Sequence, residues 1–414
     1  MLLVAGCTSA PDAIGTGSTS SSASTPVTAS ATGPHSSSSS SSSSSATQPG
    51  MLTGPGVDET QITLGTLIDP ATDRGFLEGL QLWKQSVNNA GGICGRSITV
   101  LSSGTADVPT ALTDAYRALG TRVLGFVTQT GSADVRTSLA TLLTADQVPA
   151  LTVSGTATDL LYSSPVVIGP TDDILAINAL DDLVTTGVVK AGDQVGVVTA
   201  GSTAATNAME GLRWYADRHN LTLVVQTASG RDKTTLSGLP AVFALTEPAD
   251  TASIVADLPM STVVVTTLAG YDPTLVAAAD ATHLDITMST PAFGADHPGA
   301  TAVGSAITAA GVTPGALTFA GYASGANWQR LLEAACEAQS LTRAGVLTAL
   351  TTVGRASIES LLGGSDPSLP ALRQLPATRS SAMAMADPTL PTGLRPLTGL
   401  IVAAGVEDYV AGAS

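Results

Sequence analysis

Apolar residues in this chain follow two alternating patterns from Gln61 onward. Ile62–Leu67 is a short, mostly apolar segment of the kind that forms a buried strand. In the segment after it, apolar residues recur at offsets of four, three and four, which places them on one face of a helix. These residues are Phe76, Leu80, Trp83 and Val87. The pair Gly91-Gly92 predicts the end of that helix.

The same alternation continues toward residue 165. Further strands are predicted at Ile98–Leu101, Val123–Val127 and Leu151–Val153, and further helices at Val108–Leu119 and Ala133–Ala145. Consecutive strand–helix–strand units imply a parallel sheet with helices on both faces.

A second series of the same kind follows the segment Pro165–Pro170. Its predicted strands are Gln194–Val198, Leu221–Val225, Ala241–Leu245 and Thr262–Thr266, and its predicted helices are Ile174–Thr186, Asn207–His219, Thr251–Asp257 and Thr274–Asp280. A long amphipathic helix, Asn327–Gln339, comes after this series. The pattern therefore predicts an α/β protein with two doubly wound parallel sheets. Ligands bind such sheets beyond the carboxyl ends of the strands, and two lobes that face each other form a cleft.

The N-terminal part has a different composition. Residues 8–57 are mostly Ser, Thr, Ala, Gly and Pro, with an unbroken serine run at Ser36–Ser45, and they predict a flexible, disordered linker. Before it, Val4-Ala5-Gly6-Cys7 resembles a bacterial lipobox, in which the cysteine is acylated. Residues 1–7 are too short for a signal peptide, so we expect translation to begin upstream of Met1. The alternative is a chance sequence at a cytosolic N-terminus.

Charge and composition exclude several functions. The chain of 414 residues has 33 acidic and 17 basic side chains, a net charge of −16, which disfavours nucleic-acid binding. It has no P-loop, no Gly-x-Ser-x-Gly motif and no metal-ligand spacing among its four histidines, so we predict a non-enzyme without metal or cofactor. After the N-terminal segment no apolar run reaches the length of a membrane span. Cys94 and Cys336 either pair in a disulfide or remain separate buried thiols.

Several motifs, in their order and spacing, resemble one family. They are Ile62–Gly65, the helix end Asn89-Ala90-Gly91-Gly92-Ile93-Cys94-Gly95-Arg96, Val123–Gly125 with Thr128–Gly131, and Val148–Thr156. Together they resemble the type I periplasmic binding proteins related to the branched-chain amino acid-binding proteins of ABC transporters. The resemblance runs from about Gln61 to Leu350.

The resemblance implies a type I periplasmic binding protein fold, in which two α/β lobes are joined by a three-crossover hinge and close on a ligand. It assigns residues 58–164 and 295–352 to lobe 1, and residues 165–294 and 353–414 to lobe 2. Both Cys94 and Cys336 then fall in lobe 1, where pairing is geometrically feasible.

The resemblance also implies a set of ligand-binding residues. In the family, hydroxyls and backbone N–H groups at lobe 1 turns hold the ligand carboxylate, where helix N-termini offer free donors. Gln129 and Thr130 occupy the first such turn, and Gly155 and Thr156 the second. The alternative is that these four are ordinary turn and N-cap residues.

Three further positions depart from the family pattern. Arg74 replaces an aromatic residue and either clamps a second carboxylate or carbonyl of the ligand or is a solvated loop arginine. Glu247 replaces a lobe 2 aromatic residue and could bind a ligand ammonium, because the family's acidic residue falls near Leu268. Tyr322 is a candidate wall of the cleft, or alternatively part of the core.

The predicted function follows from the resemblance and the lipobox. We expect an extracytoplasmic solute-binding lipoprotein, a monomer held at the outer face of the cell membrane only by a lipid on Cys7. It would deliver a small polar ligand, such as an amino acid, an amide or a short carboxylate, to an ABC permease. The alternatives are a ligand-sensing module and a degenerate module that no longer transports.

Overall fold

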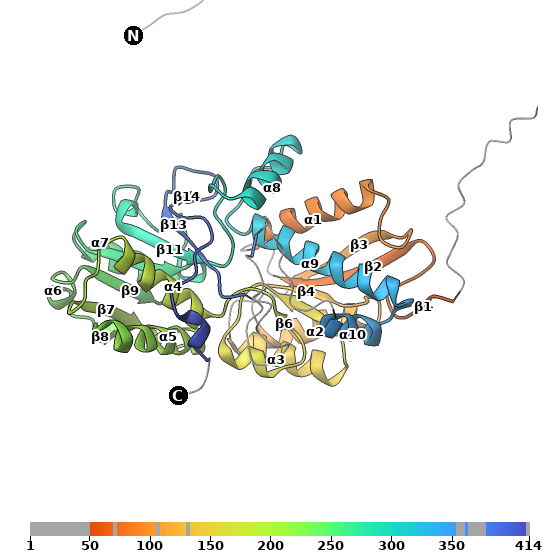
Figure 1. Cartoon of the computed structure of the whole chain (residues 1–414), viewed down its shortest axis with the longest axis horizontal. Helices are drawn as coiled ribbons and strands as arrows, with labels where there is room; N and C mark the ends of the chain where they lie inside the picture. The colour runs from red at the N-terminus through yellow and green to blue at the C-terminus, as the bar shows by residue number, and fades with distance from the viewer. Residues whose placement is uncertain are drawn as a thin grey trace, which may run out of the picture. The chain divides into compact units, whose positions relative to one another are not determined.

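The computed structural model describes residues 50–68, 73–104, 108–129, 133–352, 361–362 and 378–410 (Figure 1). All of these belong to one compact unit, residues 46–414. Two candidate residues, Cys7 and Thr130, lie outside the described residues, as does most of the predicted linker. None of the helices in the described part combines the length and the apolar character that a membrane span requires.

The first sheet has five parallel strands in the order β3-β2-β4-β5-β6. The strands are β2 (Gln61–Ile68), β3 (Ser97–Gly104), β4 (Phe126–Thr128), β5 (Ala150–Thr152) and β6 (Val166–Val167). Every residue of β2 after Gln61 is buried, as expected of a central strand covered on both faces. The described residues thus confirm the predicted parallel sheet.

Six helices and a small two-stranded sheet belong to this part of the chain. The helices are α1 (Arg74–Asn89), α2 (Pro109–Gly120), α3 (Ala133–Ala145), the 3-10 helix η1 (Ala157–Leu161), α9 (Thr318–Glu337) and α10 (Arg343–Thr352). The small sheet pairs β1 (Leu52–Thr53) with β12 (Ser340–Leu341). Figure 1 shows α1 and α9 lying together over one face of the sheet.

A disulfide connects the ends of these two helices. Cys94 lies in the turn after α1 and Cys336 is in the last turn of α9, and their sulfur atoms are bonded. The two Cα atoms are 6.2 Å apart, which lies within the ordinary range for a disulfide. Of the two alternatives that the sequence left open, the structure has the pair.

The second sheet has seven strands in the order β14-β13-β11-β10-β9-β7-β8. Five strands run parallel: β7 (Gln194–Thr199), β8 (Thr222–Thr227), β9 (Ala241–Leu245), β10 (Val263–Thr267) and β11 (Leu284–Met288). Two antiparallel strands from the C-terminal part, β13 (Ala382–Ala386) and β14 (Leu394–Pro396), extend one edge. The chain therefore passes between the two sheets three times, after β6, after β11 and after α10.

The remaining helices connect strands of the second sheet, lie in sequence between the two sheets, or follow the last strand, β14. They are α4 (Asp172–Thr185), α5 (Thr203–His219), α6 (Lys233–Leu236), α7 (Pro248–Asp257) and α8 (Pro298–Ala309), with short 3-10 turns η2 (Ala228–Gly230), η3 (Leu268–Gly270), η4 (Ala281–His283) and η5 (Val406–Asp408). Residues of α8 pack into the same hydrophobic core as α1 and α9.

Some predicted elements differ from the structure. The helix predicted at Thr274–Asp280 is wrong, since these residues form turns. The Oδ1 atom of Asp272 accepts hydrogen bonds from the backbone N–H and the hydroxyl of Thr274, at 2.8 and 2.7 Å, and this local pattern favours a turn over a helix. The long helix begins at Thr318 instead of Asn327, because its first half is rich in small residues that carry little apolar pattern.

Candidate functional site

The two predicted ligand turns follow neighbouring strands at the carboxyl edge of the five-stranded sheet. Strands β4 and β5 are parallel neighbours, so the residues that follow them lie at the same edge. The Nε2 atom of Gln129, after β4, is 3.5 Å from the Oγ atom of Ser154, after β5. The Oε1 atom of Gln129 is buried and has no hydrogen-bond partner among the described residues. The structure therefore brings Gln129 to the turn that contains Gly155 and Thr156.

Thr156 is engaged within the protein as the N-cap of η1. Its backbone N–H and its hydroxyl both donate to the Oδ2 atom of Asp159, at 2.6 and 2.9 Å, and it is 2% exposed. Asp159 in turn forms a buried ion pair with Arg136, with 3.2 Å between its Oδ2 atom and the Nε atom. Because the hydroxyl proton of Thr156 is already donated to Asp159, only a lone pair of this oxygen is left for a ligand.

Gly155 connects the same turn to the start of α4. Its carbonyl oxygen accepts a hydrogen bond of 3.0 Å from the backbone N–H of Asp172, and it bridges to Thr171. A Cβ atom at this position would lie 2.9 Å from Val167 Cγ2 and 3.2 Å from Asp159 Oδ2. The close neighbours explain why a residue without a side chain stands here.

The other three predicted residues are not part of this group. Arg74, the first residue of α1, has a side chain that is 84% exposed and pairs with Glu78 one helical turn away, at 2.9 Å. Glu247 is an exposed N-cap of α7, after β9, and Tyr322 is a half-buried residue of α9 that packs against the core. Within the described ranges, no hydrogen bond or ion pair connects these three residues to Gln129 or Ser154.

Ser154 is a further candidate ligand-binding residue, one that is not among the residues predicted from the sequence. Its half-buried hydroxyl accepts from Gln129, and its own proton has no acceptor in the described part of the chain. The signal was present, because Ser154 lies inside the Val148–Thr156 motif. The sequence alone does not show which of the two nearby hydroxyl groups, that of Ser154 or that of Thr156, is engaged as a helix N-cap.

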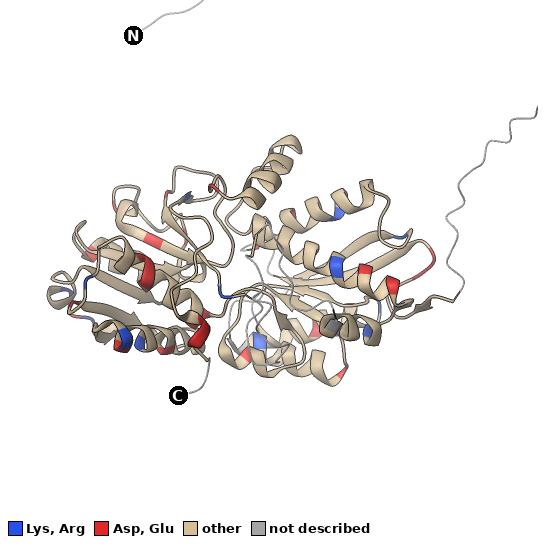
Figure 2. Cartoon of the chain, in the orientation of Figure 1, with Lys and Arg blue, Asp and Glu red and all other residues tan. Residues whose placement is uncertain are grey.

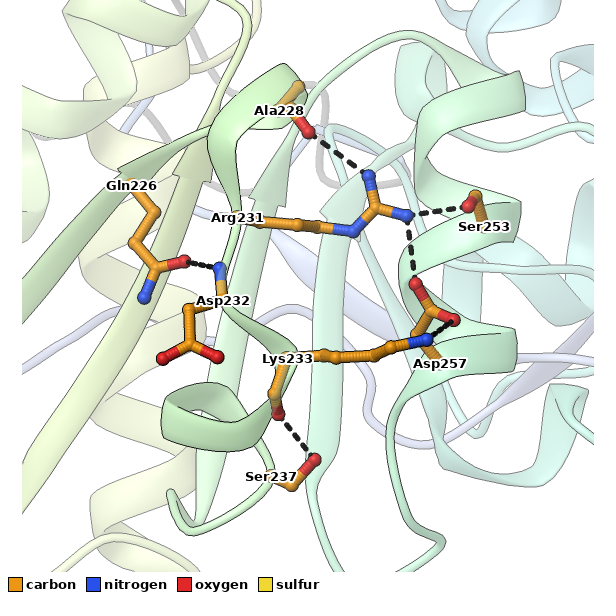
Figure 3. Close-up of polar contacts among 8 residues, drawn as sticks. All are labelled: Gln226, Ala228, Arg231, Asp232, Lys233, Ser237, Ser253 and Asp257. Carbon is orange, nitrogen blue, oxygen red and sulfur yellow. Dashed lines mark hydrogen bonds and ion pairs between the residues drawn. The ribbon is translucent and has the colours of Figure 1, made fainter.

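Charged side chains are sparse over both sheets (Figure 2). The cations Arg231 and Lys233 lie close together near the start of α6, but both contact Asp257 of α7, at 3.0 and 3.1 Å (Figure 3). Arg231 also donates to Ser253 Oγ and to the carbonyl oxygen of Ala228, at 2.6 and 3.0 Å. Hydrogen bonds from Lys233 and Arg231 hold the pKa of Asp257 below its usual value. This cluster connects α6 to α7 and is not a free cationic site.

Several solved structures with similar folds are named as ABC transporter or leucine-binding proteins. A fatty acid ABC transporter substrate-binding protein from Thermomonospora curvata matches with a TM-score of 0.74 and 20% identity, over 87% of this chain and 97% of that one. A branched-chain amino acid ABC transporter protein from Thermus thermophilus, with bound valine, matches with a TM-score of 0.66 and 15% identity, over 85% and 98%. A leucine-binding protein from Thermotoga maritima matches with a TM-score of 0.65 and 14% identity, over 84% and 100%. These similarities confirm the predicted fold.

The amino-acid sequence itself identifies the family. No curated protein matches the chain. A family model described as periplasmic binding protein matches residues 66–368, well over half of the chain. This is a family of solute-binding proteins that act outside the cytoplasm. The chain therefore belongs to the periplasmic binding protein family.

Proposed function

We propose that this protein is a lipid-anchored receptor that captures a small polar ligand and delivers it to an ABC permease. The observation that carries the proposal is the Gln129–Ser154 pair at the carboxyl edge of the first sheet, in a chain of the periplasmic binding protein family. The pair offers an amide oxygen and a hydroxyl proton without partners among the described residues. These groups suit an amino acid, an amide or a short carboxylate. The fatty acid, valine and leucine named for the similar structures share a carboxylate with this class.

The mechanism we propose is closure of two lobes on the ligand. Lobe 1 comprises residues 58–164 and 295–352, and lobe 2 comprises residues 165–294 and 353–414. A ligand that contacts both lobes stabilises the closed state relative to the open one. Gln129, Ser154 and the backbone at Gly155 would bind it from lobe 1, with a lone pair of Thr156 as an acceptor; Thr130 remains a candidate from the family resemblance alone. Glu247 would bind a ligand ammonium from lobe 2, and Arg74 and Tyr322 are peripheral candidates.

A thermal-shift screen of the full chain tests ligand binding. The panel contains amino acids, amides, mono- and dicarboxylates and fatty acids. A ligand at 100 times its Kd stabilises the folded state by about 2.7 kcal/mol, enough for a measurable shift. Calorimetry with the compound that gives a shift then measures its Kd in two variants, Ser154→Ala and Gln129→Ala. Each should weaken binding by about fivefold, the loss of one hydrogen bond.

A matched control removes a hydroxyl elsewhere. Ser305 is exposed on α8, and its hydroxyl donates only to the carbonyl oxygen of Thr301 in its own helix, at 2.8 Å. Ser305→Ala should leave the Kd unchanged. Equal weakening in the control and the Ser154→Ala variant would count against the assignment of this turn.

The lipid anchor on Cys7 needs its own experiment. The chain is expressed behind a complete lipoprotein signal in a host that acylates such cysteines, with an alkyne fatty acid in the medium. We expect label and membrane association in the native sequence, and neither in Cys7→Ser. Label in the Cys7→Ser variant would contradict the anchor without affecting the ligand site.

A degenerate module that binds a partner instead of a small ligand is one alternative function; the other, a ligand-sensing module, would bind its ligand at the same turn. Two observations favour the degenerate module: the Thr156 hydroxyl donates to Asp159, and the Arg74 guanidinium pairs with Glu78. Both candidates are thus satisfied by the protein itself. If no compound of the panel shifts a cooperatively unfolding protein, this alternative becomes the better account.

A further inference from the structure

A buried carboxylate next to the candidate ligand turn connects that turn to the C-terminal part of the chain. Asp173, the second residue of α4, is 0% exposed. Its carboxylate accepts four hydrogen bonds. The donors are the Thr171 hydroxyl, the Ile174 backbone N–H at 2.8 Å, the Asn207 side-chain amide at 3.1 Å and the Tyr409 hydroxyl at 2.9 Å.

Asn207 connects this carboxylate to the ligand turn. While its Nδ2 atom donates to Asp173, its Oδ1 atom accepts from the backbone N–H of Ala157, at 3.2 Å. Ala157 directly follows Gly155 and Thr156, the turn beside Gln129. Two longer contacts also hold this amide: its Oδ1 atom accepts from the backbone N–H of Asp173 at 3.4 Å, and its Nδ2 atom donates to Glu210 Oε2 at 3.5 Å. The shorter hydrogen bonds of this buried amide join the Asp173 carboxylate on one side to the ligand turn on the other.

Tyr409 is the remote member of this cluster, 236 positions from Asp173 in the sequence. It is 5% exposed, and its ring packs edge-on against Trp214 of α5, with 5.3 Å between centroids. Its carbonyl oxygen accepts from Arg379 at 2.9 Å. Burial and the neighbouring Asp173 raise the pKa of the Tyr409 hydroxyl, so it stays protonated and donates.

We propose that Tyr409 is a positioning residue for ligand binding: through Asp173 and Asn207 it holds the Gly155–Ala157 turn in place. The C-terminal segment then supplies a support for a ligand turn that lies far away in the sequence. Without the Tyr409 hydroxyl, Asp173 has one donor fewer and the Asn207 amide loses part of what orients it. The hydrogen bond from the backbone N–H of Ala157 to Asn207 Oδ1 would then open more often. This role rests on the proposed function, in which the turn contacts the ligand.

The molecule offers a matched control for Tyr409→Phe. Tyr215 of α5 is also buried, and its hydroxyl also donates to a carboxylate of α4, that of Asp181 at 2.8 Å. Burial raises its pKa as well. In the part of the chain that the structure describes, neither Tyr215 nor Asp181 is hydrogen-bonded to Asn207 or Ala157. Tyr215→Phe therefore removes the same kind of interaction between a tyrosine and α4 without touching the ligand turn.

The experiment measures amide hydrogen exchange at Ala157 in the full chain, which needs no ligand. We expect exchange about tenfold faster in Tyr409→Phe than in the native protein, the change that corresponds to losing one hydrogen bond of about 1.4 kcal/mol. In Tyr215→Phe the rate should stay within about twofold, although both variants lose similar global stability. Equal rates in the two variants would overturn the proposal, because a purely structural role predicts equal effects.

A third variant covers the case in which Tyr409→Phe does not fold. Trp214→Leu removes the ring that Tyr409 packs against and leaves the Asp173 carboxylate intact. It should accelerate exchange at Ala157 by an intermediate factor, and an unchanged rate would contradict the coupling. Once a ligand is found, Tyr409→Phe should raise its Kd and Tyr215→Phe should not. Failure to find a ligand would weaken the proposed function and leave the exchange result standing, so the two failures are distinguishable.

Discussion

The close contact between α1 and α9 predicts that two glycine-to-alanine substitutions change the free energy of unfolding in opposite directions. Gly321 of α9 lies directly against the backbone of α1. A Cβ atom there would be 1.9 Å from the carbonyl oxygen of Phe76 and 3.0 Å from the backbone nitrogen of Leu80. Since the obstacles are backbone atoms, no change of rotamer can make room, and Gly321→Ala must push the two helices apart.

The magnitude follows from two opposing contributions. Overpacking in a well-packed core costs about 1–3 kcal/mol, and a clash with backbone belongs at the upper end of that range. Replacing glycine by alanine inside a helix returns about 0.5–1 kcal/mol. We therefore expect Gly321→Ala to lower the free energy of unfolding by about 2 kcal/mol.

Gly304→Ala is the control. Gly304 is also a buried helical glycine, in α8, but a Cβ atom there would lie 3.4 Å from the Phe293 ring, an ordinary van der Waals distance. This variant should gain about 0.5–1 kcal/mol from the helix propensity alone.

The assay is urea unfolding followed by tryptophan fluorescence. Trp83 and Trp328 are both buried in the core that α1 and α9 share, so the signal reports on the region that the substitution disturbs. A midpoint for Gly321→Ala equal to or above that of the native protein would refute the close contact. A loss of stability in both glycine variants would show that the direction of the stability change does not depend on the space around each glycine.

Two further predictions concern a crosslink and a titrating group. Replacing Cys94 and Cys336 by serine should lower the free energy of unfolding by up to about 5 kcal/mol, because the disulfide joins residues 242 positions apart. Native protein treated with a reductant should unfold at the same urea concentration as this variant. Burial, with Asp182 nearby, raises the pKa of Asp285 in β11 to about 7. The folded state then binds more protons than the unfolded state between about pH 4 and 7, so this group lowers stability as the pH rises through that window. Asp285→Asn should be more stable than the native protein at pH 8, by about 4 kcal/mol in urea titrations, and should nearly match it near pH 4. Asp217→Asn, at an exposed position of α5, should show neither effect.

Local patterns determined the elements whose burial is regular. The offsets of Phe76, Leu80, Trp83 and Val87 predict α1, and all four are buried as that pattern requires. The run at β9 is apolar and the run at β2 is mostly apolar, because both strands are covered on both faces, so composition predicts them. The α/β class with two parallel sheets follows from the succession of such segments.

Strands β13 and β14 were not predicted, and tertiary contacts explain why. They are short, and they become strands by pairing antiparallel with the edge of a sheet whose other members lie far earlier in the chain. The first half of α9 was missed for a related reason. Its small residues, including Gly321, are selected by the close approach of α1 and leave no apolar periodicity to read.

The sequence by itself determined the fold class and the turns that carry the candidate site. Only the tertiary structure decided which side chains of those turns remain available. Thr156 and Ser154 look alike as hydroxyl residues of one motif. The hydroxyl of Thr156, however, donates its hydrogen bond to Asp159, whereas the hydroxyl of Ser154 contacts Gln129 across the sheet edge. The role of Tyr409 was equally invisible, because a hydrogen bond to a residue 236 positions away leaves no trace in local sequence. Hydrogen-bond partners are set by distance in space, and periodicity records only which face of an element is buried.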